Sequence, residues 1–392
     1  MKNFKKGSKK LTNAWAFYDW ANSVYPLVIS TAVFPIYYSS ITSSFANSNG
    51  DISFLGVMWN PTALYDYTLS LSFLIVAFCS PLLSAVADYT GNKLKFMKFF
   101  CLLGSVSVMC LFFFKGPETL WVALTFTILA SIGFWGSIVF YNAYLPEIAY
   151  NNQQDEVSAK GFIYGYAGSV LLLVFSLVMV QKPEWFGILD PSLAPRITFL
   201  LVGIWWFGFA QITYRRLPND IYNRKPEKDY IWKGVRELRL VLRELKNLPQ
   251  LRYFLISFFL FSVGVQTIVL MAGIFGSKEL GLPTTNLILT IILVQIVAIF
   301  GAYLFSKLSN KIGNIKSLKF ENTLLKYLSF KYKLEFFSSV YKSIVFPLSN
   351  LRLDKSIKLS PRLGAETLIH NILLCEGSIL DISRFFCLKK IK

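Results

Sequence analysis

The sequence predicts an all-α polytopic membrane protein. Of its 392 residues, 54% are hydrophobic and only 16% are charged, against roughly 25% in soluble domains. The apolar residues gather into runs of about 18 or more, which are longer than ordinary core helices need. Phe, Tyr and Trp together reach 17%, and aromatic residues are enriched where membrane spans meet water.

Eight apolar stretches predict membrane helices, each near the roughly 20 residues that cross a bilayer. The first follows a basic N-terminal segment and continues too far for a signal peptide, so we expect an uncleaved span. In chain order the expected spans are Trp15–Ile41, Tyr67–Ala87, Phe96–Phe114, Leu120–Leu145, Phe162–Gln181, Ile197–Tyr214, Tyr253–Phe275 and Leu287–Phe305.

The distribution of Lys and Arg predicts the orientation of these spans. Cytoplasmic loops of membrane proteins carry an excess of both residues. Here they concentrate at the N-terminus, after the even-numbered spans and in the segment between the sixth and seventh spans. We therefore expect the N-terminus in the cytoplasm. The only Lys and Arg residues expected on the opposite side of the membrane are Lys115, Lys182, Arg196 and Lys278.

The net charge of +18 does not indicate nucleic-acid binding, because the charges lie between apolar runs and at the chain ends. Lipid headgroups and topology explain such a distribution better. Residues 230–248, "YIWKGVRELRLVLRELKNL", place apolar side chains on one helical face and basic side chains mostly elsewhere. This pattern favours an amphipathic helix on the inner leaflet, and the alternative is a helix that packs only on protein.

Several kinds of chemistry find no support in the sequence. The five cysteines lack metal-site or CxxC spacing, and the only histidine is His370. A zinc site or a nucleophile–histidine pair is therefore not expected. No Walker A or dinucleotide-type glycine loop is present, so we expect no cofactor and no ATP-driven pumping. No set of catalytic groups converges, so the protein is not expected to be an enzyme.

The chain carries a short internal repeat. Residues 82–95 read "LLSAVADYTGNKLK" and residues 304–316 read "LFSKLSNKIGNIK", which align at an offset of 222. Each copy follows the second span of its half if the halves start at the first and seventh spans. Chance similarity between two turns is the alternative. Duplicated halves are typical of secondary transporters, which bind substrate at mid-membrane between the halves.

The first copy resembles the signature loop of the major facilitator superfamily. Four further stretches resemble the autophagy-related vacuolar amino-acid effluxer branch of that superfamily and its bacterial relatives. They are "WAFYDWANSVYPLVISTAVFPIYY" (15–38), "FYNAYLPEIA" (140–149), "GFIYGYAGS" (161–169) and "GVQTIVLMAGIFGSKELGL" (264–282). The resemblance covers about residues 14–316 and implies a bacterial inner (plasma) membrane transporter.

The resemblance assigns a gating role to Asp88, Gly91, Lys93 and Lys95. It implies that Asp88 docks against a helix of the other half as a latch. A capping aspartate in a loop that only sets topology is the alternative. Gly91 permits a tight turn, and we expect Lys93 and Lys95 to hold the loop at the lipid headgroups.

Polar residues near the apolar spans are candidates for a substrate or proton path. Asp19 and Asn22 share a helix face and are the first candidates. Because Asp19 is only a few residues into its expected span, an interfacial aspartate is an equal alternative. Asn142, Gln266 and Thr267 offer groups suited to the carboxylate and amine of an amino acid, or alternatively bonds between helices.

Other residues predict helix packing and helix ends. Gly161, Gly165 and Gly168 put small residues on one side of the fifth span, which predicts close packing. Pro26 and Pro35 predict a bend in the first span. Glu147 follows Pro146 and is expected at a helix boundary.

The sequence organisation predicts four segments: 1–214, a six-helix bundle; 215–252, a basic linker; 253–316, the first two helices of an incomplete second bundle; and 317–392, an atypical tail. The tail has no apolar run long enough to span a bilayer. Loss of the reading frame near residue 317 is one hypothesis, and a genuine cytoplasmic domain is the other.

The expected function is secondary active transport of a small solute by alternating access. Amino acids are the class implied by the resemblance, with proton coupling suggested by the sparse carboxylates. A truncated, inactive or assembly-only membrane protein is the alternative.

Overall fold

The computed structural model describes residues 5–90, 93–219 and 284–312, together with the single residues Arg243, Pro249, Arg252 and Gly281. The expected seventh span, the amphipathic stretch at 230–248 (apart from Arg243), Gln266, Thr267 and the tail at 317–392 lie outside the described residues. The long helices are α3 (Pro61–Thr90), α4 (Lys93–Cys110), α5 (Leu120–Ile148), α6 (Asn151–Gln181), α7 (Leu193–Tyr214) and α10 (Thr284–Ile312).

Six helical stretches of the described chain are long and apolar enough to cross a membrane, and they coincide with the first six expected spans. The eighth expected span falls within α10. Each of the six helical stretches continues past the expected apolar run at one end or both. The second span, for example, is expected from Tyr67, whereas α3 begins at Pro61.

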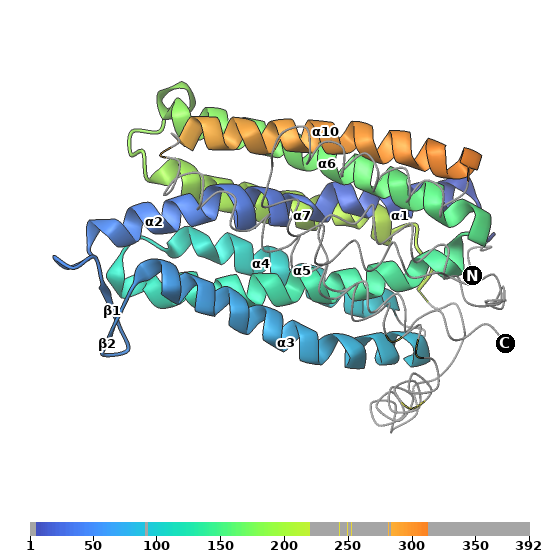
Figure 1. Ribbon diagram of the computed structural model, residues 1–392, viewed down its shortest axis with the longest axis horizontal. Coiled ribbons are helices and arrows are strands. Elements are labelled where there is room, and N and C mark those ends of the chain that lie inside the picture. Colours follow the sequence, from blue (N-terminus) through green and yellow to red (C-terminus); the bar gives the residue numbers. More distant parts are fainter. Residues whose placement is uncertain are drawn as a thin grey trace.

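The long helices lie side by side along one axis (Figure 1). Helix α4 packs between α5 and α7, α1 (Lys9–Asn22) packs against α6 and α7, and α3 packs against α5. Helix α10 runs along the outer side of α6. We call the end of the bundle where α1 begins the N-side and the opposite end the far side.

Glycines let α4 and α5 approach closely. A Cβ atom built on Gly133 of α5 would lie 2.4 Å from the Cα atom of Gly104 in α4. Contacts of this kind need small residues, because helices in lipid associate through close packing rather than through a hydrophobic driving force. The surrounding core is largely aromatic, and Trp15, Tyr18 and Trp206 are fully buried in it.

The first span is not one continuous α-helix. It passes from α1 into a nine-residue π-helix, η1 (Tyr25–Val33), and then into α2 (Phe34–Ser44). The Thr31 hydroxyl donates to the Pro26 carbonyl oxygen at 2.9 Å, and the Phe34 N–H donates to the Ile29 carbonyl. The second bond joins a backbone N–H to the carbonyl five residues earlier, which is the π-helical register, and the Thr31 hydroxyl spans the same interval with its side chain. The prolines expected to bend this span thus accompany a change of hydrogen-bond register.

The far side carries short elements between the long helices. Strands β1 (Ile52–Phe54) and β2 (Val57–Trp59) form an antiparallel hairpin between α2 and α3. The short helices η2 (Leu111–Phe113) and η3 (Pro117–Thr119) join α4 to α5, and η4 (Pro183–Phe186) follows α6. At this end the Arg196 side chain donates to the Phe112 carbonyl oxygen at 2.6 Å and ties α7 to η2.

Candidate functional site

Asp19 lies within the packed part of the bundle. It comes ten residues after the start of α1 at Lys9, which is roughly 15 Å along a helix rising 1.5 Å per residue. Its Oδ2 atom accepts a hydrogen bond of 2.7 Å from the Tyr141 hydroxyl of α5. Asp19 thus contacts a neighbouring helix, and its part in a substrate or proton path stays a prediction.

The glycine stripe of α6 makes room for this face of α1. A Cβ atom on Gly161 would lie 2.3 Å from the Asp19 Oδ2 atom, and one on Gly165 would lie 2.5 Å from the Ser23 hydroxyl. A Cβ atom on Gly168 would lie 2.9 Å from the Trp20 ring. The predicted close packing is therefore confirmed, and it serves to seat a carboxylate and a hydroxyl between two helices.

Tyr141 is held in place by Trp15. The two rings stack with centroids 4.2 Å apart and an interplanar angle of 8°. The Trp15 indole N–H also donates to the Tyr141 carbonyl oxygen at 2.8 Å. Both contacts fix the ring whose hydroxyl reaches Asp19. The sequence reasoning missed Tyr141, although it stands next to Asn142 in the "FYNAY" stretch.

Two of the candidate amide side chains, Asn22 and Asn142, are buried in the bundle, whereas Gln266 lies outside the described residues. Asn22 is 1% exposed, and its Nδ2 atom has no hydrogen-bond partner within the described part of the chain. Asn142 is also buried, next to Tyr141 in α5. Because an unsatisfied buried donor is costly, Asn22 is suited to a polar partner such as water or a solute.

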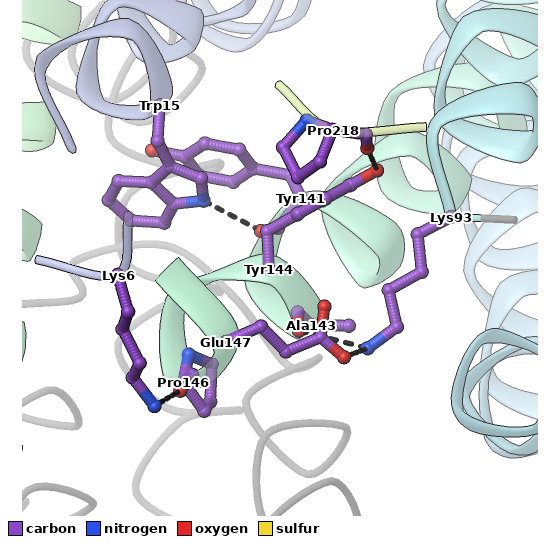
Figure 2. Close-up of polar contacts among 9 residues, drawn as sticks. All are labelled: Lys6, Trp15, Lys93, Tyr141, Ala143, Tyr144, Pro146, Glu147 and Pro218. Carbon is purple, nitrogen blue, oxygen red and sulfur yellow. Dashed lines mark hydrogen bonds and ion pairs between the residues drawn. The ribbon is translucent and has the colours of Figure 1, made fainter. Parts of the chain in front are cut away.

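The N-side end of α5 is the second polar region. The last carbonyl groups of a helix lack partners within the helix, and they carry its negative dipole end. Here the Lys6 ammonium donates to the Pro146 carbonyl oxygen at 2.8 Å, and the Gly7 N–H donates to the Ile148 carbonyl oxygen at 2.7 Å. Figure 2 shows Lys6 and Lys93 reaching this end of α5 from two sides. The Tyr144 hydroxyl extends the network by donating to the Pro218 carbonyl oxygen at 2.9 Å.

Lys93 corrects one of our expectations. Its ammonium group contacts the Glu147 Oε1 atom at 2.5 Å and the Ala143 carbonyl oxygen at 3.1 Å. The exposed fractions of the Lys93 and Glu147 side chains are 2% and 8%. The expectation that Lys93 holds a loop at the headgroups was therefore wrong. Lys93 is the first residue of α4, and the carboxylate and carbonyl at the end of α5 attract its charge inward.

The structure gives less detail for the other three residues of the gating motif. Lys95 is exposed, and its expected contact with lipid headgroups stays a prediction. Asp88 lies in the last turn of α3, and Gly91 lies outside the described residues. The latch assigned to Asp88 therefore stays a prediction.

Comparison with known proteins identifies the family. Residues 7–337 match the family described as vacuole effluxer Atg22 like. The chain belongs to this Atg22-like family. The match begins before the stretch on which the resemblance was based and continues past Lys316.

Two curated relatives, one bacterial and one fungal, show similarity over most of the chain. The chain is 31% identical over 312 residues to an uncharacterized MFS-type transporter, YxiO, of Bacillus subtilis (strain 168), covering 79% of this chain and 69% of that one. It is 24% identical over 336 residues to autophagy-related protein 22-1 of Penicillium rubens, covering 66% and 55%. The chain thus spans about half the length of this fungal relative.

A solved structure with the same fold is a bacterial homologue of the iron transporter ferroportin in its outward-facing state. The TM-score is 0.53 at 14% identity, over 97% of this chain and 87% of that one. At this identity the likeness shows the fold alone. Family and fold together establish a multi-pass membrane transporter of the major facilitator type. Among the described residues of this Atg22-like chain, no group of three or more His, Cys, Asp or Glu side chains could hold a metal ion.

Proposed function

We propose that the protein is a secondary transporter that moves amino acids or similar small solutes by alternating access. The observation that carries this proposal is the Asp19–Tyr141 pair, a carboxylate seated between α1, α5 and α6 with its hydroxyl partner. Ionisable groups inside membrane spans are costly and mark substrate or proton paths. The family match supports the same function, because its description is that of an effluxer.

The proposed substrate path uses the polar groups of the first half together with those of the second. Asp19 and Asn22 of α1 and Asn142 of α5 supply a carboxylate and two amides, and Gln266 and Thr267 are assigned to the same path. A carboxylate suits the ammonium group of an amino acid, and amide groups suit both its ends. The remaining side of the path belongs to the proposed second bundle, residues 253–316, after the linker at 215–252.

The proposed gate is on the N-side, which we place in the cytoplasm of a bacterial cell. Asp88, Gly91, Lys93 and Lys95 form the gating motif, with Asp88 as the latch against the second half. The Lys93–Glu147 pair supports this assignment because it fixes the start of α4 to the end of α5. A fixed contact between these two helix ends would let Asp88 dock against the second half without moving the neighbouring helices.

We further propose that transport is coupled to protons and that Asp19 is the group that takes up the proton. Its neighbour Tyr141 offers a hydroxyl that donates to the ionised carboxylate. When Asp19 is protonated, the carboxyl group no longer needs that donor and can rearrange. The coupling is therefore expected to depend on both residues.

The test is uptake and counterflow in proteoliposomes with a panel of amino acids, with and without a pH gradient. The proposal expects saturable transport of at least one amino acid, accelerated by the gradient. Asp19→Asn should lose the acceleration, whereas Glu118→Gln, which removes an exposed carboxylate on the far side, should retain it. Absence of saturable transport across the panel overturns the substrate class. An unchanged gradient effect in Asp19→Asn overturns the role of Asp19.

A further inference from the structure

The β1–β2 hairpin has an unusual residue at its tip. Phe54 pairs with Val57, so Leu55 and Gly56 form a two-residue turn. Their φ angles are +52° and +76°. Turns with positive φ at both central positions favour Asn-Gly or Asp-Gly, because a leucine there is strained. A strained residue is retained only where the surroundings hold it in place, and it points to a function.

The tip is strongly apolar and exposed. The exposed fractions are 87% for Leu55, 52% for Val57 and 51% for Met58. No charged residue occurs from Ile52 to Trp59. Exposed apolar patches of this kind mark sites that bind protein or membrane.

The base of the hairpin is firmly seated. Ile52 is buried in the main core, and Phe54 and Trp59 pack against that core. The Asn47 side chain accepts hydrogen bonds from the Asn49 and Asp51 N–H groups at 2.9 and 2.8 Å. These contacts keep the tip extended from the bundle and do not let it fold back onto the core.

The position of the hairpin selects the partner. It joins two membrane spans at the far side and projects sideways beside the start of α3 (Figure 1). The Trp59 ring lies 6.1 Å from the Tyr67 ring of α3, in a T-shaped contact. The exposed face of α3 then continues along the span with Leu71, Leu74 and Phe78. The apolar tip is thus continuous with the surface of a membrane-spanning helix, at the level where aromatic residues meet headgroups.

We propose that the tip of the β1–β2 hairpin inserts into the bilayer leaflet on the far side. Its ligand is lipid, at the boundary between headgroups and acyl chains. There Leu55, Val57 and Met58 leave water, while the polar Asn47–Asp51 segment stays outside. The hairpin anchors the corner between α2 and α3 at a defined depth. This inference rests on the membrane spans and not on the transport activity.

Nitroxide labels test the insertion directly. Leu55→Cys, Val57→Cys and Asn49→Cys are labelled in a full-length background whose five native cysteines are replaced by serine, and each protein is placed in phospholipid vesicles. Oxygen concentrates in the bilayer and a nickel chelate stays in water. The proposal expects labels at 55 and 57 to be more accessible to oxygen than to nickel, and the label at 49 to show the reverse.

Two outcomes overturn the proposal. Labels at 55 and 57 that are as accessible to nickel as the label at 49 place the tip in water. Labels at 55 and 57 that are shielded from both reagents place it against protein, either another part of this chain or a second copy. The label at position 57 leaves Leu55 and the strained turn unchanged. Its accessibility to oxygen and nickel therefore tests the proposal even if Leu55→Cys alters the turn. A further variant, Leu55→Asn, keeps a turn-compatible residue and should shift the Val57 label toward water.

Discussion

Tyr141 shows how one residue makes a carboxylate usable inside a membrane span. Its ring stacks on Trp15, its carbonyl accepts the Trp15 N–H, and its hydroxyl donates to Asp19. The two contacts with Trp15 hold Tyr141 in place, and its hydroxyl then orients the Asp19 carboxylate of a neighbouring helix. A polar group inside a membrane span is costly unless hydrogen-bond donors of this kind satisfy it.

Replacing Tyr141 with phenylalanine separates the hydroxyl from the stacked ring. Tyr141→Phe should keep the contact with Trp15 and lose the bond to Asp19. Hydrogen bonds to charged groups contribute about 1.5–3 kcal/mol, so we expect a loss of stability near that size and a weaker effect of the pH gradient on transport. Tyr164→Phe, in a partly buried tyrosine of α6, is the matched control and should change little. Thermal unfolding in detergent and gradient-driven uptake measure both effects, and equal behaviour of the two variants would contradict the role of Tyr141.

Gly161 is predicted to tolerate no side chain. The Cβ atom of Gly161→Ala would lie 2.3 Å from the Asp19 Oδ2 atom, so α1 and α6 must separate or the carboxylate must leave Tyr141. Overpacking of this kind costs about 1–3 kcal/mol. Gly208→Ala in α7 meets nothing within 4 Å and should instead stabilise the helix by roughly 0.5–1 kcal/mol. Chemical or thermal unfolding of the two variants checks the opposite signs, and destabilisation by both would remove the specific role of Gly161.

At the scale of the element, the first span combines a fixed end with an irregular middle. The N-side part of α1 is tied to three helices. Thr213 of α7 donates to the Ala14 carbonyl at 2.8 Å, and Lys160 of α6 donates to Asn13 at 2.7 Å. The Trp15 indole donates to the Tyr141 carbonyl of α5 at 2.8 Å. The π-helix η1 follows directly. π-Helical turns are often found at functional sites. We therefore expect the far-side part of this span, beyond η1, to move while the N-side part of α1 stays in place.

Thr31→Val tests whether the π-helix matters for transport. Valine keeps the shape of threonine but loses the bond from the hydroxyl to the Pro26 carbonyl, which supports the π-register. We expect a loss of about 1 kcal/mol in stability together with a changed maximal transport rate. Thr68→Val in α3 removes an ordinary bond to the Leu64 carbonyl and should affect stability alone. If both variants transport at the rate of the unchanged protein, the Thr31 bond in η1 has no role in transport.

The Lys93–Glu147 pair predicts a non-additive double-mutant cycle between α4 and α5. Removing one partner leaves the other charge buried, and such losses are about 3–5 kcal/mol. Lys93→Met and Glu147→Gln should each destabilise the protein strongly, whereas the double variant should recover much of the loss. Unfolding of the four proteins in detergent gives the coupling energy. Additive losses would show that the two side chains act separately.

For the whole molecule, apolar runs alone predicted the six described spans of the N-terminal bundle, because the bilayer requires long apolar helices. Hydropathy did not reveal where helices continue into polar sequence, as α3 does before Tyr67. It also did not reveal the π-helix or the hairpin, which depend on local hydrogen bonds. The Asp19–Tyr141 contact joins residues 122 apart, and Lys93 turned inward because of an acceptor 54 residues away. Such partners follow from helix packing, which a single sequence does not specify.

The orientation of the whole molecule is the last prediction, and it follows from the charges at its two ends. The described N-side carries twelve basic residues: Lys5, Lys6, Lys9, Lys10, Lys93, Lys95, Lys98, Lys160, Arg215, Arg216, Lys307 and Lys311. The far side carries Lys115, Lys182 and Arg196. Because positive charge is retained in the cytoplasm, the far side should face outward. In a cysteine-free background, a membrane-impermeant thiol reagent added to intact cells should label Asn49→Cys and not Lys95→Cys, since both positions are exposed at opposite ends. Permeabilised cells should allow labelling of both, which controls for reactivity. Labelling of Lys95→Cys alone in intact cells would reverse the orientation and place the Lys93–Glu147 corner on the outer surface.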